Sequence, residues 1–368
     1  MIPVNEPLIG AKEIEYVTEC LKTGWISSAG HYIEEFERRW AEYCGMGYGV
    51  AVCNGTVALE AALACLELQP GDEVIMPSFT IISCALAVVE AGAIPVLVDS
   101  DPRTWTMDVQ QVAAKITPRT RAIMPVHIYG HPVDMDPLRV LAKQHHLMII
   151  EDAAEAHGAE YKGQRCGGLG DVACFSFYAN KILTTVEGGM ILARDAEMAE
   201  RLRGERNLAF RPERRFYHTQ LGHNYRMTNI QAAIGVAQLE RIDEHLAHKR
   251  WMARAYSERL ADLAQIQLPV EEPWAKNVYW MYGLVLDEEV GYDAAEFAHR
   301  LRAEGVETRP FFLGMHEQPV FHERGLFIDE SYPVAERIAR QGLYLPSGLT
   351  LSESQVDQVC AAVRRVLA

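Results

Sequence analysis

Long hydrophobic runs are missing from this chain. No apolar stretch approaches the roughly 20 residues that a membrane-spanning helix requires. The first twenty residues also lack the basic start and apolar segment of a secretory signal peptide, because acidic side chains interrupt them. We therefore expect a soluble, cytoplasmic protein with no membrane partner.

Paired cysteines and an excess of positive charge are missing as well. The eight cysteines contain no Cys-x-x-Cys pair, which favours reduced, buried thiols. The net charge of −15 argues against a nucleic-acid partner, which would need a basic face. The thirteen histidines include no His-x-x-x-His pair with acidic neighbours, and we interpret His145-His146 as a solvated helix end. We therefore expect no metal site.

What the chain does contain is an alternation of short apolar runs with helical patterns, typical of a parallel α/β sheet. A length of 368 residues allows about two domains. The apolar runs predict strands at 73–77, 94–99, 121–128, 147–153, 172–178 and 189–193. A helical pattern precedes these strands at 57–68, and further ones lie between them at 109–116 and 137–146. Such apolar strands suit a sheet that is covered on both faces.

The second part of the chain has a different pattern. An apolar stripe predicts one long helix from Met227 to about Leu260, long enough to join two domains. Beyond it we predict strands at 278–286 and 306–312, and helices at 294–304 and from Ser352 onward. The predicted architecture is therefore a large α/β domain over 1–240 and a smaller α+β domain over 241–368.

Asp152 and Lys181 carry the clearest chemical signal. Asp152 ends an apolar strand, where open α/β sheets place their ligands, and Lys181 follows the next strand in a turn rich in Ser, Thr and Gly. Pyridoxal 5′-phosphate (PLP) takes a lysine as its Schiff base and a carboxylate for its pyridinium nitrogen. The pair predicts a PLP enzyme in which Lys181 also moves protons; the alternative is an ordinary solvated loop lysine.

Four further residues fit a phosphorylated cofactor. Gly55 and Thr56 follow Asn54 at a helix start, where free N–H groups and the helix dipole bind anions. Ser176 can donate a hydrogen bond to the same phosphate. Glu155 can approach the phenolic oxygen of the cofactor. Taken alone, Asn54 is better interpreted as a simple helix cap, and Glu155 fits nearly as well as an acid favoured by a helix dipole.

An arginine-rich stretch, 201–226, stands out in an acidic protein and alternates with aromatic residues. Its arginines are Arg201, Arg203, Arg206, Arg211, Arg214, Arg215 and Arg226. Arginine binds phosphates through two parallel hydrogen bonds, so the stretch is a candidate for a phosphate partner, although charge runs are often merely solvated. A nicotinamide-binding alternative has little support, because Gly167–Asp171 lacks the Gly-x-Gly-x-x-Gly spacing and does not link a strand to a helix.

These residues lie within segments that resemble the DegT/DnrJ/EryC1/StrS sugar aminotransferases, a fold type I PLP family. The resemblance follows chain order over essentially the whole sequence. Its segments are 23–28, 54–56, Pro77-Ser-Phe-Thr80, Pro125-Val-His-Ile-Tyr-Gly130, Glu151-Asp-Ala-Ala-Glu155, Phe175-Ser-Phe-Tyr-Ala-Asn-Lys181, Thr184-Thr-Val-Glu-Gly-Gly-Met190 and Asn224-Tyr-Arg-Met-Thr-Asn-Ile-Gln-Ala-Ala-Ile234.

The resemblance implies a homodimer with shared active sites and glutamate as amino donor. It implies a nucleotide-linked keto sugar as acceptor, in the first place GDP-4-keto-6-deoxy-D-mannose. Lys181 and Asp152 become the catalytic pair. The implied cofactor contacts are Gly55, Thr56, Ile81, Asp152, Glu155, Ser176, Lys181 and, from the neighbouring subunit, Asn224. The implied substrate contacts are Ser27, Tyr178, Arg226 and His316.

Two positions depart from the family pattern. Relatives often have an aromatic residue at position 81 that stacks on the PLP ring, where this chain has Ile81 unless Phe79 takes over. They usually have glycine at position 186, and because valine avoids positive φ, Val186 predicts a different local turn. The alternatives left open are another keto sugar (UDP- or dTDP-linked, 3-keto, or an inosose), a sugar dehydratase, and a non-catalytic PLP-binding regulator. Lys181 argues against the dehydratase branch, which has histidine at that position.

Overall fold

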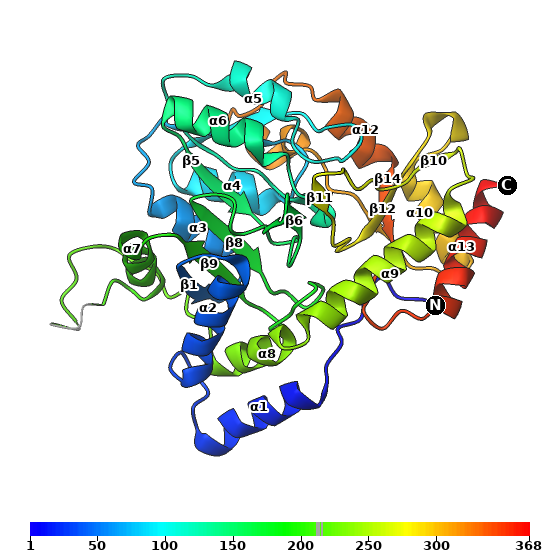
Figure 1. The fold of residues 1–368 in the computed structure, drawn as a ribbon. Coiled ribbons are helices and arrows are strands. Elements are labelled where there is room, and N and C mark those ends of the chain that lie inside the picture. Colours follow the sequence, from blue (N-terminus) through cyan, green and yellow to red (C-terminus); the bar gives the residue numbers. More distant parts are fainter. Residues whose placement is uncertain (211–213, 215) are drawn as a thin grey trace.

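The computed structural model describes residues 1–210, 214 and 216–368. Within them, a seven-stranded sheet has the order β1-β9-β8-β5-β4-β2-β3; β9 pairs antiparallel with β1 and β8, and the other pairings are parallel (Figure 1). Its strands are β1 (Tyr48–Val52), β2 (Glu73–Pro77), β3 (Ile94–Val98), β4 (Thr120–Ile123), β5 (Met148–Asp152), β8 (Val172–Ser176) and β9 (Gly189–Ala193). The predicted α/β class with a mostly parallel sheet is confirmed.

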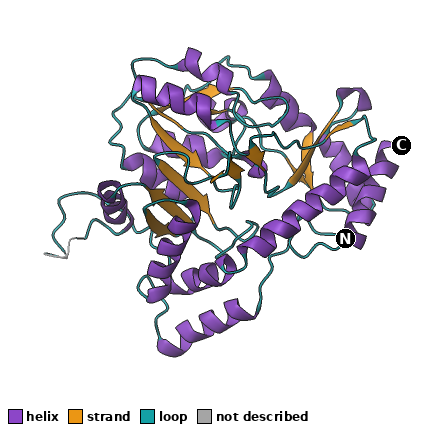
Figure 2. Ribbon diagram, viewed as in Figure 1, coloured by secondary structure: helices purple, strands orange, loops and turns teal. Residues whose placement is uncertain are grey.

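Helices flank this sheet, as Figure 2 shows, which explains why its strands are so apolar. Every residue of β2 and of β9 is buried. The helices of this part are α1 (Ala11–Thr23), α2 (His31–Cys44), α3 (Gly55–Ala64), α4 (Ile82–Glu90), α5 (Val109–Lys115), α6 (Met135–His145) and α7 (Ala196–Arg206). His145 and His146 are exposed at the end of α6, in agreement with a solvated helix end.

The predicted long helix is wrong in one respect, because the structure divides it. The helix α8 (Asn229–Leu239) ends before α9 (Ile242–Leu260) begins, and Arg241 between them has a non-helical φ of −115° and ψ of 11°. The carboxylate of Glu240 accepts hydrogen bonds from Lys12 and Tyr16 of α1 and from Arg39 of α2. These partners are distant in sequence, so the apolar stripe gave no sign of the break.

The second part of the chain has its own sheet and core. Its sheet has the order β10-β12-β14-β13, and a core of apolar side chains runs from Met252 to Val363 and includes Ile2. The strands are β10 (Ile266–Gln267), β12 (Tyr282–Leu286), β13 (Arg309–Pro310) and β14 (Gly342–Leu345). Its helices are α10 (Ala294–Ala303), α11 (Pro319–His322), α12 (Pro333–Gln341) and α13 (Glu353–Leu367), with 3-10 turns Glu288–Val290 and Met315–Glu317. A domain boundary at residue 240 remains a prediction.

Two predicted strands of this part are shorter in the structure. The strand expected at 278–286 begins at Tyr282, because residues before it turn toward another loop: the Trp280 N–H donates to the Tyr129 carbonyl at 2.9 Å. The strand expected at 306–312 is only Arg309–Pro310, where proline removes a ladder donor. A small third sheet joins β11 (Ala275–Lys276), β6 (Glu160–Tyr161) and β7 (Gln164–Arg165).

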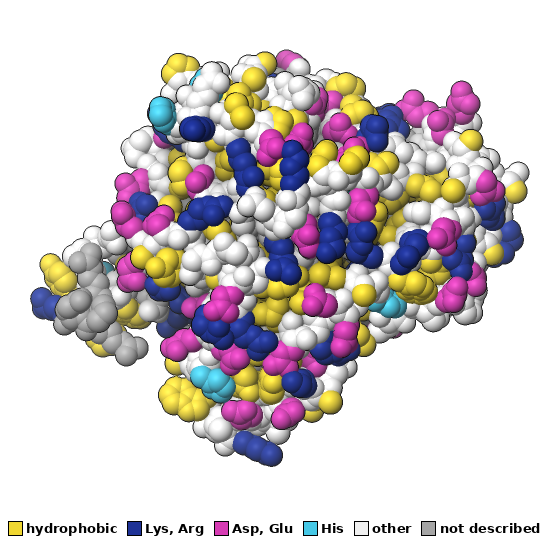
Figure 3. All heavy atoms as spheres, in the orientation of Figure 1, with side chains coloured by type: hydrophobic (Ala, Val, Ile, Leu, Met, Phe, Trp, Pro, Cys, Tyr) yellow, Lys and Arg dark blue, Asp and Glu magenta, His cyan; other side chains and the backbone are white. Residues whose placement is uncertain are grey.

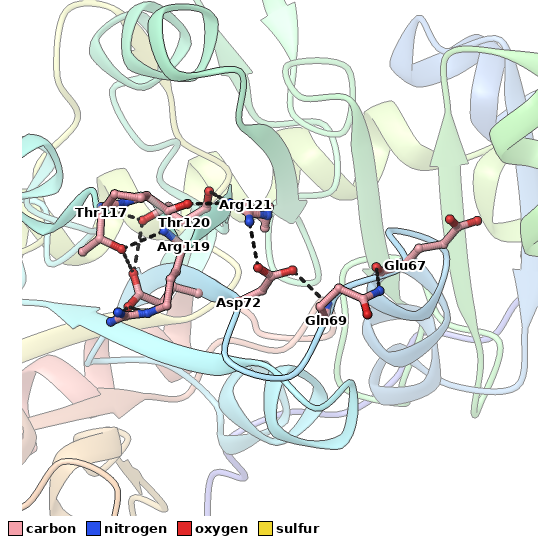
Figure 4. Close-up of polar contacts among 9 residues, drawn as sticks. Glu67, Gln69, Asp72, Thr117, Arg119, Thr120 and Arg121 are labelled. Atoms are coloured by element: carbon pink, nitrogen blue, oxygen red, sulfur yellow. Dashed lines mark hydrogen bonds and ion pairs between the residues drawn. The ribbon is translucent and has the colours of Figure 1, made fainter.

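The amino-terminal end of the parallel strands carries a network of polar contacts (Figure 4). The Arg121 guanidinium lies 3.1 Å from the Asp72 carboxylate, which also accepts the Gln69 N–H at 2.8 Å. Arg119 and Thr117 both donate to the Glu73 carboxylate at the start of β2. These contacts tie β2 to the segment that leads into β4 and leave the opposite, carboxyl end of the strands for a binding site.

The molecular surface in the view of Figure 3 has basic and acidic side chains interspersed, so the negative net charge is not gathered into one patch on this face. Over the described residues, no helix combines the length and the apolar character that a membrane crossing would need.

Candidate active site

A cavity of 580 Å³ opens at the carboxyl ends of the parallel strands, where open α/β sheets bind ligands. Its walls come from the ends of β5 and β8, from the first turns of α3 and α4, and from three aromatic side chains of the second part of the chain. Eight predicted site residues line it: Gly55, Thr56, Ile81, Asp152, Glu155, Ser176, Tyr178 and Lys181.

Lys181 is buried in this cavity between an acid and an indole. Its Nζ lies 3.7 Å from Glu155 Oε1 and 3.8 Å from the centre of the Trp280 ring. Burial lowers the pKa of Lys181, although the carboxylates of Glu155 and Asp152 oppose the decrease. A lysine with a lowered pKa holds more of the neutral amine, which is the form that attacks a carbonyl and accepts a proton.

Asp152 lies at the last position of β5, with its carboxylate held from two sides. Its Oδ1 accepts the Ala154 N–H at 3.0 Å, and its Oδ2 accepts the Cys84 thiol at 3.0 Å. The main chain continues the sheet beyond the strand, since the Asp152 N–H donates to the Pro125 carbonyl at 2.9 Å. The side chain therefore has a fixed orientation, as a partner for a ring nitrogen requires.

Glu155 lies on the loop that follows β5. Its Oε2 accepts the N–H of Tyr129 at 2.7 Å, and its Oε1 faces Lys181. Burial raises the pKa of Glu155 to about 7, with the Lys181 ammonium opposing the rise. The side chain can therefore exist in either protonation state near neutral pH and can donate to, or accept from, an oxygen in the cavity.

The opposite end of the cavity is built to receive an anion. The helix α3 begins at Gly55, capped by Asn54, whose Oδ1 accepts the Val57 N–H at 3.0 Å. A Cβ on Gly55 would lie 2.6 Å from the Ser176 Cβ, so only glycine lets the helix start approach the end of β8. Thr56 Oγ1 lies 2.9 Å from Ser83 Oγ. The first N–H groups of a helix have no intrahelical partner and can hold a phosphate.

The two departures from the family pattern have different outcomes. Ile81 lines the cavity, whereas Phe79 is buried against Tyr129 and Phe311 outside it. The expectation that Val186 would avoid positive φ is wrong, because its φ is 73°. The turn is held by the Val186 N–H, which donates to Thr184 Oγ1 at 2.9 Å. Such a conformation costs a β-branched residue about 1–3 kcal/mol.

Four predicted residues do not line the cavity. Ser27 and Asn224 are exposed, and Arg226 donates through its Nε to Asn224 Oδ1 at 2.7 Å. His316 is buried, with its Nδ1 2.7 Å from Ser78 Oγ and its Nε2 3.1 Å from a carboxylate oxygen of Glu336. The roles predicted for these four residues remain predictions.

The arginine-rich stretch is largely engaged elsewhere. Arg201, Arg203 and Arg206 belong to α7 and pair with Glu67, Glu200 and Glu37 respectively. Arg214 lies over the Tyr217 ring, 4.6 Å from its centre. Arg211 and Arg215 lie outside the described residues. Among the arginines of this stretch that the structure describes, Arg226 is therefore the better candidate for a phosphate contact.

Sequence reasoning missed the residues that the second part of the chain contributes. Trp280, Phe312 and Tyr344 all line the cavity, as does Thr80. Their positions depend on how two distant parts of the chain pack, and no local motif marks them. Cys84 was also missed, although a cysteine four residues after Thr80 in the first turn of α4 was a visible signal.

The residues present fit PLP. A buried lysine, a fixed carboxylate and a helix start with free N–H groups share one cavity, and these are the three groups that the cofactor's aldehyde, ring nitrogen and phosphate require. Lys181 would hold the aldehyde carbon, Asp152 the ring nitrogen, and Gly55, Thr56 and Ser176 the phosphate.

Comparisons with known proteins agree with this reading. The sequence profile of the DegT/DnrJ/EryC1/StrS aminotransferase family matches residues 7–364. A GDP-perosamine synthase of Caulobacter vibrioides is 46% identical over 367 residues, covering 100% of this chain and 98% of the relative. A GDP-perosamine synthase of Escherichia coli O157:H7 is 41% identical over 362 residues, covering 98% and 97%.

Solved structures are similar over the whole chain. The aminotransferase TlmJ from Streptoalloteichus hindustanus superposes with a TM-score of 0.93 at 33% identity, covering 100% of this chain and 99% of that one. The profile match and these full-length relatives establish the family. This chain belongs to the DegT/DnrJ/EryC1/StrS aminotransferase family and is an aminotransferase.

Proposed function

We propose that this protein is a PLP-dependent 4-aminotransferase that converts GDP-4-keto-6-deoxy-D-mannose to the 4-amino sugar with glutamate as donor. The observation that carries the chemistry is the buried Lys181 beside Glu155 and Asp152 in one cavity. The substrate is supported by the GDP-perosamine synthases that are 46% and 41% identical over nearly the full length. The cofactor is supported by EpsN of Bacillus subtilis, which is 33% identical over 97% of this chain and is described as a "putative pyridoxal phosphate-dependent aminotransferase".

When bound, PLP supplies an electron sink that stabilises negative charge at the carbon bearing the amine. The protein supplies the rest. With PLP bound, Asp152 would keep the ring nitrogen protonated, Lys181 would carry the transferred proton, and Glu155 would hold the phenolic oxygen. Over the full cycle glutamate is converted to 2-oxoglutarate, and the keto sugar exchanges its carbonyl oxygen for the amine. The nucleotide diphosphate provides remote binding energy that holds the ketone in place.

A panel of nucleotide-linked keto sugars tests the substrate. With glutamate present, we expect amine product from GDP-4-keto-6-deoxy-D-mannose with a kcat/KM at least about 100-fold above that of dTDP- or UDP-linked 4-keto sugars, because a site built to hydrogen-bond a particular base rejects others by such factors. Product formation is followed by mass spectrometry, and 2-oxoglutarate by a coupled assay.

The first half-reaction serves as an internal control for this panel. Conversion of the PLP enzyme by glutamate alone must be seen, so that silence with a sugar is not mistaken for an inactive preparation. Turnover of a UDP- or dTDP-linked sugar with none on the GDP sugar would retain the aminotransferase and reject the proposed substrate.

We also propose that two copies of this chain share their active sites. Asn224, Arg226 and Ser27 lie outside the cavity of their own protomer and near its exposed surface. Ile14, Leu21, Trp25 and Ile26 expose between 46% and 64% of their surface in or just after α1. An exposed apolar cluster of this kind is typical of a subunit interface. In the proposed dimer, Asn224 reaches the phosphate bound by the neighbouring subunit.

Mixing an inactive variant with a weakened one tests this arrangement. Lys181→Ala lacks the lysine, and Asn224→Ala weakens the phosphate site of its neighbour. If the sites are shared, a hybrid dimer has one site with both residues intact, and random exchange should restore about a quarter of the wild-type activity. The variants on their own are the controls. No recovery after confirmed subunit exchange would show that Asn224 acts within its own protomer or not at all.

A further inference from the structure

Lys249 is a fully buried lysine far from the catalytic motifs. It belongs to α9, and only 1% of its surface is exposed. Its Nζ donates to the main-chain carbonyl of Trp280 at 2.8 Å and to that of Ser347. Both partners are neutral carbonyl groups, and the described part of the chain offers Lys249 no carboxylate.

This placement is unfavourable for stability alone. Burial lowers the pKa of Lys249 to about 7, so the ammonium form is only marginally favoured near neutral pH. Buried charged groups can often be replaced by apolar residues of similar volume without loss of stability. Stability therefore does not explain why a lysine occupies this position. Its two carbonyl partners indicate what it does there.

The two carbonyl groups mark the end of the second sheet nearest the cavity. In the antiparallel pair β12–β14, Tyr282 lies opposite Leu345. Continuing this register by two residues beyond the ladder places Trp280 opposite Ser347. The hydrogen-bond ladder between the two strands does not extend to this point, because the Trp280 N–H donates to the Tyr129 carbonyl at 2.9 Å. Lys249 thus bridges the two strands where their own hydrogen bonds end.

Trp280 is consequently fixed at three points. Its N–H is bound by Tyr129, its carbonyl by Lys249, and its indole Nε1–H donates to the Asn180 carbonyl at 2.8 Å. Asn180 directly precedes Lys181, so the indole is attached to the main chain of the catalytic turn. Tyr129 is also connected to the active site, since its own N–H donates to the Glu155 carboxylate.

The face of the fixed ring lies against the catalytic amine. Lys181 Nζ is 3.8 Å from the centre of the Trp280 ring. A cation over an aromatic face is stabilised electrostatically, most strongly over Trp and where water is excluded. The orientation of this ring therefore affects both the position of Nζ and its affinity for a proton.

We propose that Lys249 is a positioning residue of the active site that orients Trp280 against Lys181. The proposal rests on the proposed function, in which Lys181 is the lysine that binds PLP. Through its side chain and the Trp280 carbonyl, Lys249 would connect α9 to the position of Lys181, the residue that transfers the proton. Lys249 itself touches neither the cavity nor Lys181.

The test uses Lys249→Met, which keeps the volume and removes the donor, on the full-length PLP-loaded enzyme. We expect the pH midpoint of its visible absorbance to fall by about half a pH unit, because the protonated nitrogen at Lys181 loses its aromatic face. We expect the first half-reaction with glutamate to slow about threefold to tenfold at saturation, with little change in glutamate affinity. The groups that face Lys181, namely Glu155, Asp152 and Cys84, stay in place.

Three further variants separate positioning from a loss of stability. Lys249→Gln retains one donor and should give an intermediate midpoint. Trp280→Leu should lower the midpoint as Lys249→Met does, and the double variant should shift it no further. Ser257→Ala is the matched control: it also lies on α9 and removes a hydrogen bond to β12, at 2.8 Å to the Tyr282 hydroxyl, but this bond does not involve Trp280.

Two results would overturn the proposal. One is a Lys249→Met enzyme with reduced thermal stability but an unchanged midpoint and half-reaction, as expected for Ser257→Ala. The other is an equal shift of the midpoint in the presence and absence of Trp280, which would mean that the charge of Lys249 acts directly. A wild-type protein that binds no PLP would instead reject the proposed function itself.

Discussion

Lys181→Ala is expected to leave a folded, colourless protein whose transamination rate is reduced at least about 10⁴-fold. The variant loses the nucleophile and the proton carrier together, and each of these roles is worth orders of magnitude. Only the wild type should show the visible absorbance of a lysine-bound PLP, and only wild type should retain the cofactor covalently after borohydride reduction. Peptide mass mapping should then place the modification on Lys181.

The matched control for this experiment is Lys162→Ala. Lys162 is an exposed lysine of the same part of the chain, and its Nζ lies 2.5 Å from Asp136. Its removal should leave colour and rate unchanged, since exposed ion pairs contribute little. The proposal for Lys181 would be abandoned if the alanine variant kept the absorbance band, or if borohydride attached the cofactor to another lysine.

The catalytic pair could be predicted from sequence because its signals are local. Asp152 ends an apolar run, and Lys181 follows the next one, so strand periodicity alone places both at one edge of the sheet. The start of α3 could be predicted for the same reason, because Asn54 before Gly55 is a local signal for a helix N-terminus. The parallel sheet was predicted from the same apolar runs. The strand β1 was not predicted, and the strand expected at 121–128 ends at Ile123.

The residues that complete the site were not predictable in this way. Trp280 reaches Lys181 only because the strand expected at 278–286 starts late and its first residues pair with Tyr129 instead. Lys249, whose Nζ donates to the Trp280 carbonyl, is 31 residues away along the chain. The prediction for Val186 was wrong for another reason: valine disfavours positive φ, yet the folded turn, which includes the hydrogen bond from the Val186 N–H to Thr184, holds it there.

Residues predicted from the resemblance alone form a third class. Ser27 and Asn224 are exposed and remote from the cavity lining of their own protomer, so a single chain cannot give them a role. His316 is buried between Ser78 and Glu336 and has both ring nitrogens engaged. A family resemblance assigns roles to such positions without stating whether they act through a second subunit or through the packing behind the site.

Asp152→Asn is expected to lower kcat by about 10²–10³-fold while PLP stays bound. The substitution preserves the size of the side chain and the acceptor oxygen that receives the Ala154 N–H at 3.0 Å. What it removes is a negative charge next to the ring nitrogen, in a site where burial makes charge interactions strong. The rate of the first half-reaction, followed by absorbance under single-turnover conditions, measures the loss directly.

The control for this variant distinguishes charge from hydrogen bonding. Cys84→Ala leaves the carboxylate in place and removes only the thiol that donates to Asp152 Oδ2 at 3.0 Å. Its rate should fall less than about tenfold, since a single neutral hydrogen bond contributes about 1 kcal/mol. A large loss in Cys84→Ala with a small one in Asp152→Asn would reverse the assignment, because the orientation of the side chain and not its charge would then control the reaction. The predicted order, a large effect of the charge and a small effect of the thiol, follows from placing Asp152 as the partner of a protonated ring.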